Sequence, residues 1–152
     1  MPENEKALDQ SSEAAEDISK TSKKNGSRAA YWIRTAEDDF QTAQIMFDND
    51  RYIWVGFLCH LIVEKALKAI IAKGGVFPPK SHDLSRLAKL GGVYDELSEE
   101  QKQFLDRIMV FQEDLRCSDG MGVDMKLDSQ KSAAILQKTK EIFIWTRNKL
   151  SL

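Results

Sequence analysis

The stretch that most constrains the fold runs from Tyr52 to Lys73 and reads YIWVGFLCHLIVEKALKAIIAK. Nearly all of its residues are apolar, and three of the polar ones, His60, Glu64 and Lys68, recur every four positions. On an α-helix this spacing places the three side chains in one stripe. A helix this apolar must be covered by other elements over most of its surface. We therefore expect a buried central helix around which the rest of the chain packs.

Four further segments carry helical patterns or end signals. Apolar residues at intervals of three and four predict helices over about residues 28–48, 98–116 and 129–150, and a shorter helix over residues 84–90. The expected N-caps are Ser27, Ser98, Asp128 and, for the short helix, Ser81 or Asp83. No alternating pattern is long enough for a strand. The sequence thus predicts an all-α fold, an antiparallel up-and-down bundle of four long helices plus one short helix.

Composition divides the chain into two parts. Residues 1–26 hold few large apolar side chains and many Ser, Glu and Lys, so we expect a disordered polar tail, with residues 27–152 forming the bundle. The formal net charge of the whole chain is −2. The tail, with six acids and four lysines, accounts for all of it and leaves the bundle neutral. No overall basic bias therefore points to a nucleic-acid-binding protein, although a local basic patch remains compatible with this balance.

The cysteines and the apolar runs bear on the cell compartment. Two cysteines, Cys59 and Cys117, do not make a disulfide framework, and Cys59 is expected to be a buried apolar residue of the central helix. The N-terminus lacks an apolar leader segment. The apolar run from Tyr52 to Val63 is too short, and too closely followed by charges, to span a bilayer. We expect a cytoplasmic protein with reduced thiols and no membrane association.

Several common chemistries lack their motifs. The paired glycines follow no predicted strand and are not followed by the Gly-Lys-Ser/Thr of a phosphate-binding loop. The two histidines form no His-x-x-x-His pair, and neither follows a Glu by three positions, as a di-iron bundle requires. We therefore expect no metal site and no cofactor.

A small set of polar residues could carry function. The candidate contacts to an anion or a nucleotide are His60, Lys65, Lys68, His82 and Arg116, and the carboxylates that could orient them are Asp39 and Glu64. Each has a structural alternative. The stripe on the central helix could be solvated or internally salt-bridged. His82 could anchor its loop, and Arg116 could interact only with the dipole at the end of its helix.

A family resemblance emerges from the order of several segments. An acidic opening helix, AEDDFQTAQIMF, leads into HLIVEKALKAIIAKGG, then PPKSHDLSRL, then FQEDLRCSDG. Together these segments, over about residues 28–150, resemble the HEPN domain. The resemblance implies an antiparallel helical bundle in prokaryotic cytoplasm, usually a homodimer. It also implies frequent association with minimal nucleotidyltransferases, as toxin–antitoxin modules or nucleotide-binding partners.

Many HEPN proteins are metal-independent ribonucleases that use an Arg-x(4–6)-His motif, and this sequence departs from that motif. No histidine follows Arg116, and neither His60 nor His82 has an arginine at the required distance before it. The segment from Arg116 to Asp119, RCSD, instead resembles the family's R-Y-P-D variant without its Tyr and Pro. That variant is associated with nucleotide or partner binding.

Three hypotheses follow from the sequence. The first is a non-catalytic, homodimeric HEPN domain that binds a nucleotide or a nucleotidyltransferase, with the dimer suggested by excess apolar surface at Ile144 and Trp145. The second is a divergent ribonuclease toxin that acts on RNA and uses Arg116. The third is a structural helical adaptor without a ligand.

Overall fold

A single apolar helix, α2, forms the axis of the fold. The computed structural model describes the backbone of residues 3–116 and 127–151, and the side chains of residues 14–112 and 127–151. In chain order the elements are α1 (Glu3–Asp48), α2 (Tyr52–Lys73), α3 (Leu84–Leu90), the short 3-10 helix η1 (Tyr94–Glu96), α4 (Glu99–Arg116) and α5 (Ser129–Leu150). The described residues contain no strand, and α2 has the bounds that the sequence predicts.

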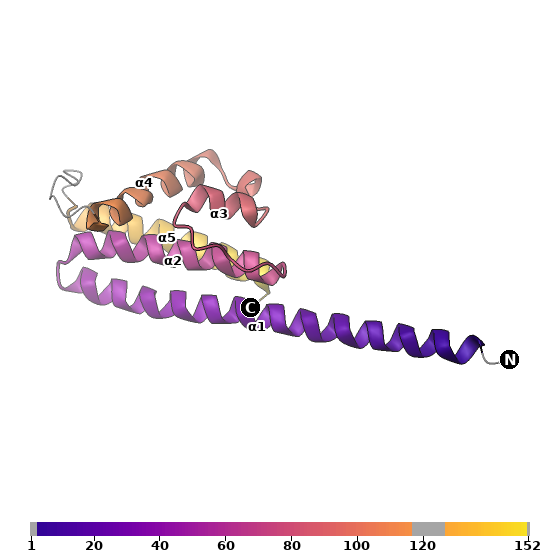
Figure 1. Ribbon diagram of the computed structural model, residues 1–152. Helices are drawn as coiled ribbons and strands as arrows, with labels where there is room; N and C mark the ends of the chain where they lie inside the picture. The colour runs from indigo at the N-terminus through magenta and orange to yellow at the C-terminus, as the bar shows by residue number, and fades with distance from the viewer. Residues whose placement is uncertain (1–2, 117–126, 152) are drawn as a thin grey trace.

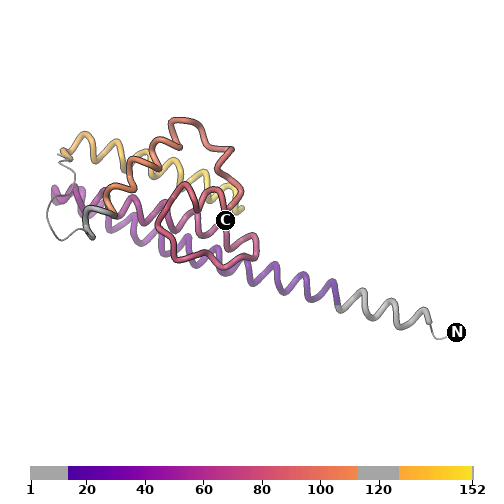
Figure 2. Tube along the Cα trace, turned by 45° about the horizontal axis from the view of Figure 1, so that its top comes forward, coloured from indigo at the N-terminus to yellow at the C-terminus, as the bar shows by residue number. Residues whose placement is uncertain are grey.

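The four long helices pack up and down, as expected (Figure 1). α1 and α2 lie antiparallel, α4 runs back across α2, and α5 returns beside it (Figures 1 and 2). α2 contacts each of the other α-helices. Its buried residues include Ile62 and Leu67, which join a core that also contains Leu87 of α3 and Phe104 and Phe111 of α4. The all-α bundle of four long helices and one short helix is confirmed.

The N-terminal segment differs from the prediction. Residues 1–26 were expected to be disordered, yet α1 is helical from Glu3 and passes through Ser27, which is therefore not an N-cap. Glu, Lys and Ala favour helix, and the helix cost of Gly26 is only about 1 kcal/mol. Residues 14–24 are exposed, and this part of α1 extends beyond the other helices (Figure 1). Asn25 and Gly26 lie beside the end of α2.

Local hydrogen bonds fix the starts of the later helices. At α4 the Ser98 Oγ accepts from the Gln101 backbone N–H at 3.1 Å, and the Gln101 side chain accepts from the Ser98 N–H at 2.9 Å. This reciprocal pair is the predicted capping box. Asp83 caps α3 by accepting from the Arg86 N–H, and Asp128 caps α5 by accepting from the Lys131 N–H. These caps confirm the expected starts of three helices.

The connection from α2 to α3 runs back over the bundle. α2 ends at Lys73 and is followed by Gly74 and Gly75. Gly75 has a φ of +86°, a conformation that favours glycine. A Cβ at Gly75 would also meet the Asn25 side chain on α1 at 3.1 Å. Pro78 and Pro79 then keep the segment extended until Asp83 starts α3. This connection places residues 76–78 beside α1.

Two glycines provide a matched test of the packing. A Cβ added at Gly56 would lie 2.7 Å from the ring of Phe111, which is buried between α2 and α4. Gly56→Ala should therefore lower the free energy of unfolding by about 1–3 kcal/mol despite the better helix propensity of Ala. Urea denaturation followed by circular dichroism measures the change.

Gly26→Ala is the control, because an added Cβ there meets only the Lys73 Nζ at 3.8 Å. Since Gly26 lies inside α1, the alanine should stabilise the protein by about 0.5–1 kcal/mol. A destabilising or absent effect at this position would contradict the continuity of α1 through residue 26.

Candidate functional site

The polar stripe of α2 is buried rather than solvated. The exposed fractions of His60, Glu64 and Lys68 are 0%, 4% and 7%. Lys68 Nζ donates to Glu64 Oε1 at 2.7 Å, one turn away on the same helix. The Lys68 ammonium also lies 5.5 Å from the centre of the Trp32 ring on α1. The hypothesis of a solvated stripe is therefore wrong, and the hypothesis of an intrahelical ion pair is confirmed.

Glu64 also holds the connection between α2 and α3. His82 Nδ1 lies 3.1 Å from both carboxylate oxygens of Glu64. Because a carboxylate accepts hydrogen bonds, Nδ1 is the protonated nitrogen of this imidazole. The His82 side chain is about one third exposed, at 36%. His82 thus anchors its loop, as one of the two interpretations of the sequence expected.

His60, one turn before Glu64 on α2, completes the cluster. Its Nε2 lies 3.1 Å from the backbone carbonyl oxygen of His82, so Nε2 must be the donor. Its Nδ1 lies 3.5 Å from Glu64 Oε2 and makes no hydrogen bond. Burial lowers the pKa of His60 below its ordinary value of 6.5, against the opposing influence of Glu64. The neutral imidazole is therefore favoured, and the contact with Glu64 is not a full ion pair.

The remaining predicted residues lie outside this cluster. Lys65 Nζ pairs with Asp39 Oδ2 across α1 and α2 at 2.6 Å. Asp39 thus pairs with one of the candidate anion contacts that it was expected to orient. Arg116 is the last residue of α4, as expected, but its side chain lies outside the described side chains. Cys117 and the expected loop at residues 117–126 also lie outside the described residues.

The four residues His60, Glu64, Lys68 and His82, here called the Glu64 cluster, link three parts of the bundle. Through His82 the cluster fixes the end of the segment that leaves α2, and through Lys68 it contacts Trp32 on α1. A buried carboxylate is tolerated when its oxygens are hydrogen-bonded and its charge is paired, and both conditions are met here. The arrangement is suited to holding structure and leaves little of Lys68 or His60 for a ligand.

A second group of polar residues was not predicted from the sequence. A groove of about 560 Å³ lies between α1 and the segment that follows α2. Its lining consists of Lys24, Ser27, Arg28, Tyr31, Trp32, Arg34, Ala72, Phe77 and Pro78. The sequence signal was the alternation of cations and aromatics in residues 24–34. The groove itself could not be recognised from these residues, because its other wall is formed by Phe77 and Pro78, which lie more than forty positions further along the chain than Trp32.

Other chemistries find no support among the described side chains. No group of three or more His, Cys, Asp or Glu residues in that part of the chain could hold a metal ion. Cys59 is buried, as expected, and burial raises the pKa of its thiol to about 12. A thiol held protonated in this way is a poor nucleophile. No helix within the described residues is long and apolar enough to cross a membrane.

Comparison with known families identifies the class of protein. The fold is an all-helical bundle whose long axis is α2, with a buried Glu–Lys–His cluster at its centre. The family model of the HEPN domain matches residues 29–149, which is most of the chain. The chain therefore belongs to the HEPN domain family. No curated protein and no solved structure matches it.

Removing the charge of Glu64 should be strongly destabilising. Glu64→Gln keeps the side-chain shape but leaves the buried Lys68 ammonium without its counter-charge. We expect a loss of about 3–5 kcal/mol in the free energy of unfolding, measured by urea denaturation. The double variant E64Q/K68M, which removes the orphaned charge, should recover part of that loss.

Glu99→Gln is the control, because Glu99 forms an i,i+3 pair with Lys102 at 84% exposure. It should leave the midpoint of the urea transition unchanged. If E64Q were as mild as E99Q, the Glu64 cluster would not be a structural element.

The lowered pKa of His60 predicts a dependence of stability on pH. Because the unfolded chain protonates this imidazole near 6.5 and the folded chain only at lower pH, folding stability should fall as the pH drops below 6.5. His60→Gln keeps a donor for the His82 carbonyl and cannot titrate. Relative to wild type, it should show a smaller loss of stability between about pH 7.5 and about pH 5.5.

Urea midpoints at a series of pH values measure this difference. The groups that face His60 are Glu64, His82 and Lys68, and they are unchanged in the variant. An identical pH profile for H60Q and wild type would show that His60 does not carry the effect.

Proposed function

We propose that this HEPN domain acts by binding, as a homodimer that takes up a nucleotide and pairs with a minimal nucleotidyltransferase in a toxin–antitoxin-like module. The observation that carries the proposal is the Glu64 cluster. It engages both histidines of the chain, His60 and His82, in contacts that hold the fold. In the ribonuclease members of the family, the resemblance implies a histidine and an arginine acting together at the scissile phosphate.

Two further observations support the proposal, one for the ligand and one for the homodimer. The lysines predicted to meet an anion, Lys65 and Lys68, are each paired with a carboxylate, so their charges are compensated. The groove lined by residues of α1 and Phe77 offers cations and aromatic rings instead. For the homodimer, Ile144 on α5 is 47% exposed, which supports an apolar contact with a second copy.

One observation favours the ribonuclease alternative. The imidazole of His82 is oriented by Glu64 and is about one third exposed, at 36%. A histidine oriented by a carboxylate is a recurrent general base. If Arg116 were to act with His82, the pair would replace the missing Arg-x(4–6)-His motif. The two hypotheses are separated by measuring RNA cleavage and nucleotide binding on the same protein.

Nucleotide binding should raise the melting temperature of the full chain, because a ligand that binds only the folded state stabilises it. At a ligand concentration of about 100 Kd the gain is about 2.7 kcal/mol, which corresponds to several degrees for a chain of this size. Differential scanning fluorimetry with ATP and the other nucleoside triphosphates at millimolar concentration measures the shift. The same preparation should not degrade RNA.

RNA degradation that disappears in Arg116→Ala would overturn the proposal in favour of the ribonuclease. No thermal shift with any nucleotide, together with no RNA cleavage, would favour the structural adaptor. Light scattering after size exclusion tests the homodimer separately, and a monomer at micromolar concentration would remove that part.

A further inference from the structure

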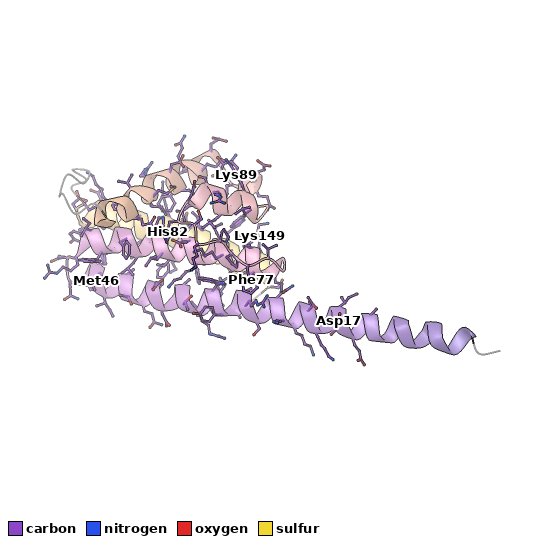
Figure 3. The ribbon with its side chains drawn as sticks, in the orientation of Figure 1. Asp17, Met46, Phe77, His82, Lys89 and Lys149 are labelled. Atoms are coloured by element: carbon purple, nitrogen blue, oxygen red, sulfur yellow. The ribbon has the colours of Figure 1, made fainter. Side chains whose placement is uncertain are left out.

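The groove lies between α1 and the segment that follows α2, and it has two walls. One wall is the face of α1 that carries Lys24, Arg28 and Tyr31. The other is formed by Phe77 and Pro78, which follow α2. Phe77 lies between α2 and α1, close to where α1 leaves the bundle (Figure 3). The volume of the groove, about 560 Å³, is within the range of small-ligand sites.

The charged residues of this groove all have one sign. Lys24, Arg28 and Arg34 line it, and the described lining contains no Asp or Glu. None of the three cations has an ion-pair partner among the described residues. Glu37, one turn beyond Arg34, pairs with Arg147 on α5 instead. The groove therefore presents uncompensated positive charge, which favours an anion.

Two of the three aromatic residues that line the groove are exposed. Phe77 is 74% exposed and Tyr31 is 55% exposed. The Arg28 guanidinium lies 4.4 Å from the centre of the Phe77 ring, which aligns a cation with an aromatic face. Tyr31 and Trp32 contact each other edge to face, with ring centres 5.8 Å apart. These rings give a flat apolar group a surface on which to stack.

The wall that carries Phe77 is held in place before any ligand arrives. At its start the Gly75 N–H donates to the Ala72 carbonyl at 3.0 Å, and at its end His82 is bound to Glu64. Pro78 and Pro79 restrict the backbone between these points. The Glu64 cluster also reaches the other wall, through Lys68 and Trp32. A preformed groove lowers the cost of ordering on binding.

We infer that this groove is a binding site for a nucleoside phosphate. The phosphates would lie against Lys24, Arg28 and Arg34, and the base would stack on Phe77 or Tyr31. Arginine and lysine recognise phosphate through charge-assisted hydrogen bonds, and base stacking on aromatic side chains tolerates any base. The inference rests on the proposed function and assigns it a location away from the residues that the sequence suggested.

The test measures ATP binding to the full chain by isothermal titration calorimetry. Arg28→Ala should weaken ATP binding about tenfold or more, because it removes a phosphate contact. Phe77→Ala should also weaken ATP binding about tenfold while leaving inorganic tripolyphosphate unaffected, since only the nucleotide has a base to stack. Phe77→Trp should restore ATP binding. Because Phe77 is exposed, its substitution should leave the chain folded, and circular dichroism checks this.

Arg107→Ala is the control, because Arg107 is an exposed arginine on α4 outside the groove lining. It should leave the affinity for ATP unchanged. ATP binding that is as tight in R28A and F77A as in wild type would overturn this location and leave the proposed function standing. No ATP binding by wild type would overturn both.

Two other outcomes also count against the inference. If tripolyphosphate bound as tightly as ATP, stacking of the base on the aromatic rings would contribute nothing to the affinity. Single-stranded RNA binding that is much tighter than ATP, and that is lost in R28A, would replace the nucleotide with a polymer as the ligand.

Discussion

The rest of the structure depends on the pairing of the Glu64 carboxylate, which is buried in the middle of α2. A charge in that position is stable only if its oxygens are hydrogen-bonded and its charge is paired. Lys68 supplies the pair from the next turn, and His82 supplies a donor from the connection to α3. Glu64, a charged residue within an otherwise apolar helix, therefore requires the connection to fold against α2.

This requirement positions the groove between α1 and Phe77. His82 ends the segment that carries Phe77, and Lys68 contacts Trp32 on the facing helix. The segment EKALKA, residues 64–69, is part of the sequence that resembles the family, and it has a physical role here because its Glu and second Lys form the buried pair. Residues that look suited to an anion in the sequence serve the fold, and other cations, on α1, line the groove beside aromatic rings.

The parts of the fold that depend on local sequence could be predicted, and those that depend on distant contacts could not. The bounds of α2, the capping box at Ser98 and the burial of Cys59 follow from periodicity and nearby residues. The contact of Glu64 with His82 and the pair of Asp39 with Lys65 each join two separate segments, so spacing along one helix could not identify them. The N-terminal extension of α1 was missed because low apolar content was taken to indicate disorder, whereas its Glu, Lys and Ala residues favour helix.

The most direct measurement of the central claim is the protonation of the two imidazoles, observed by long-range ¹H–¹⁵N NMR of the folded chain. The structure requires His60 to carry its proton on Nε2, facing the His82 carbonyl, and His82 to carry one on Nδ1, facing Glu64. His60 should remain neutral when the pH falls through 6.5, the ordinary pKa of a histidine side chain. A proton on Nδ1 of His60, or titration of His60 near 6.5, would contradict a buried cluster organised by Glu64.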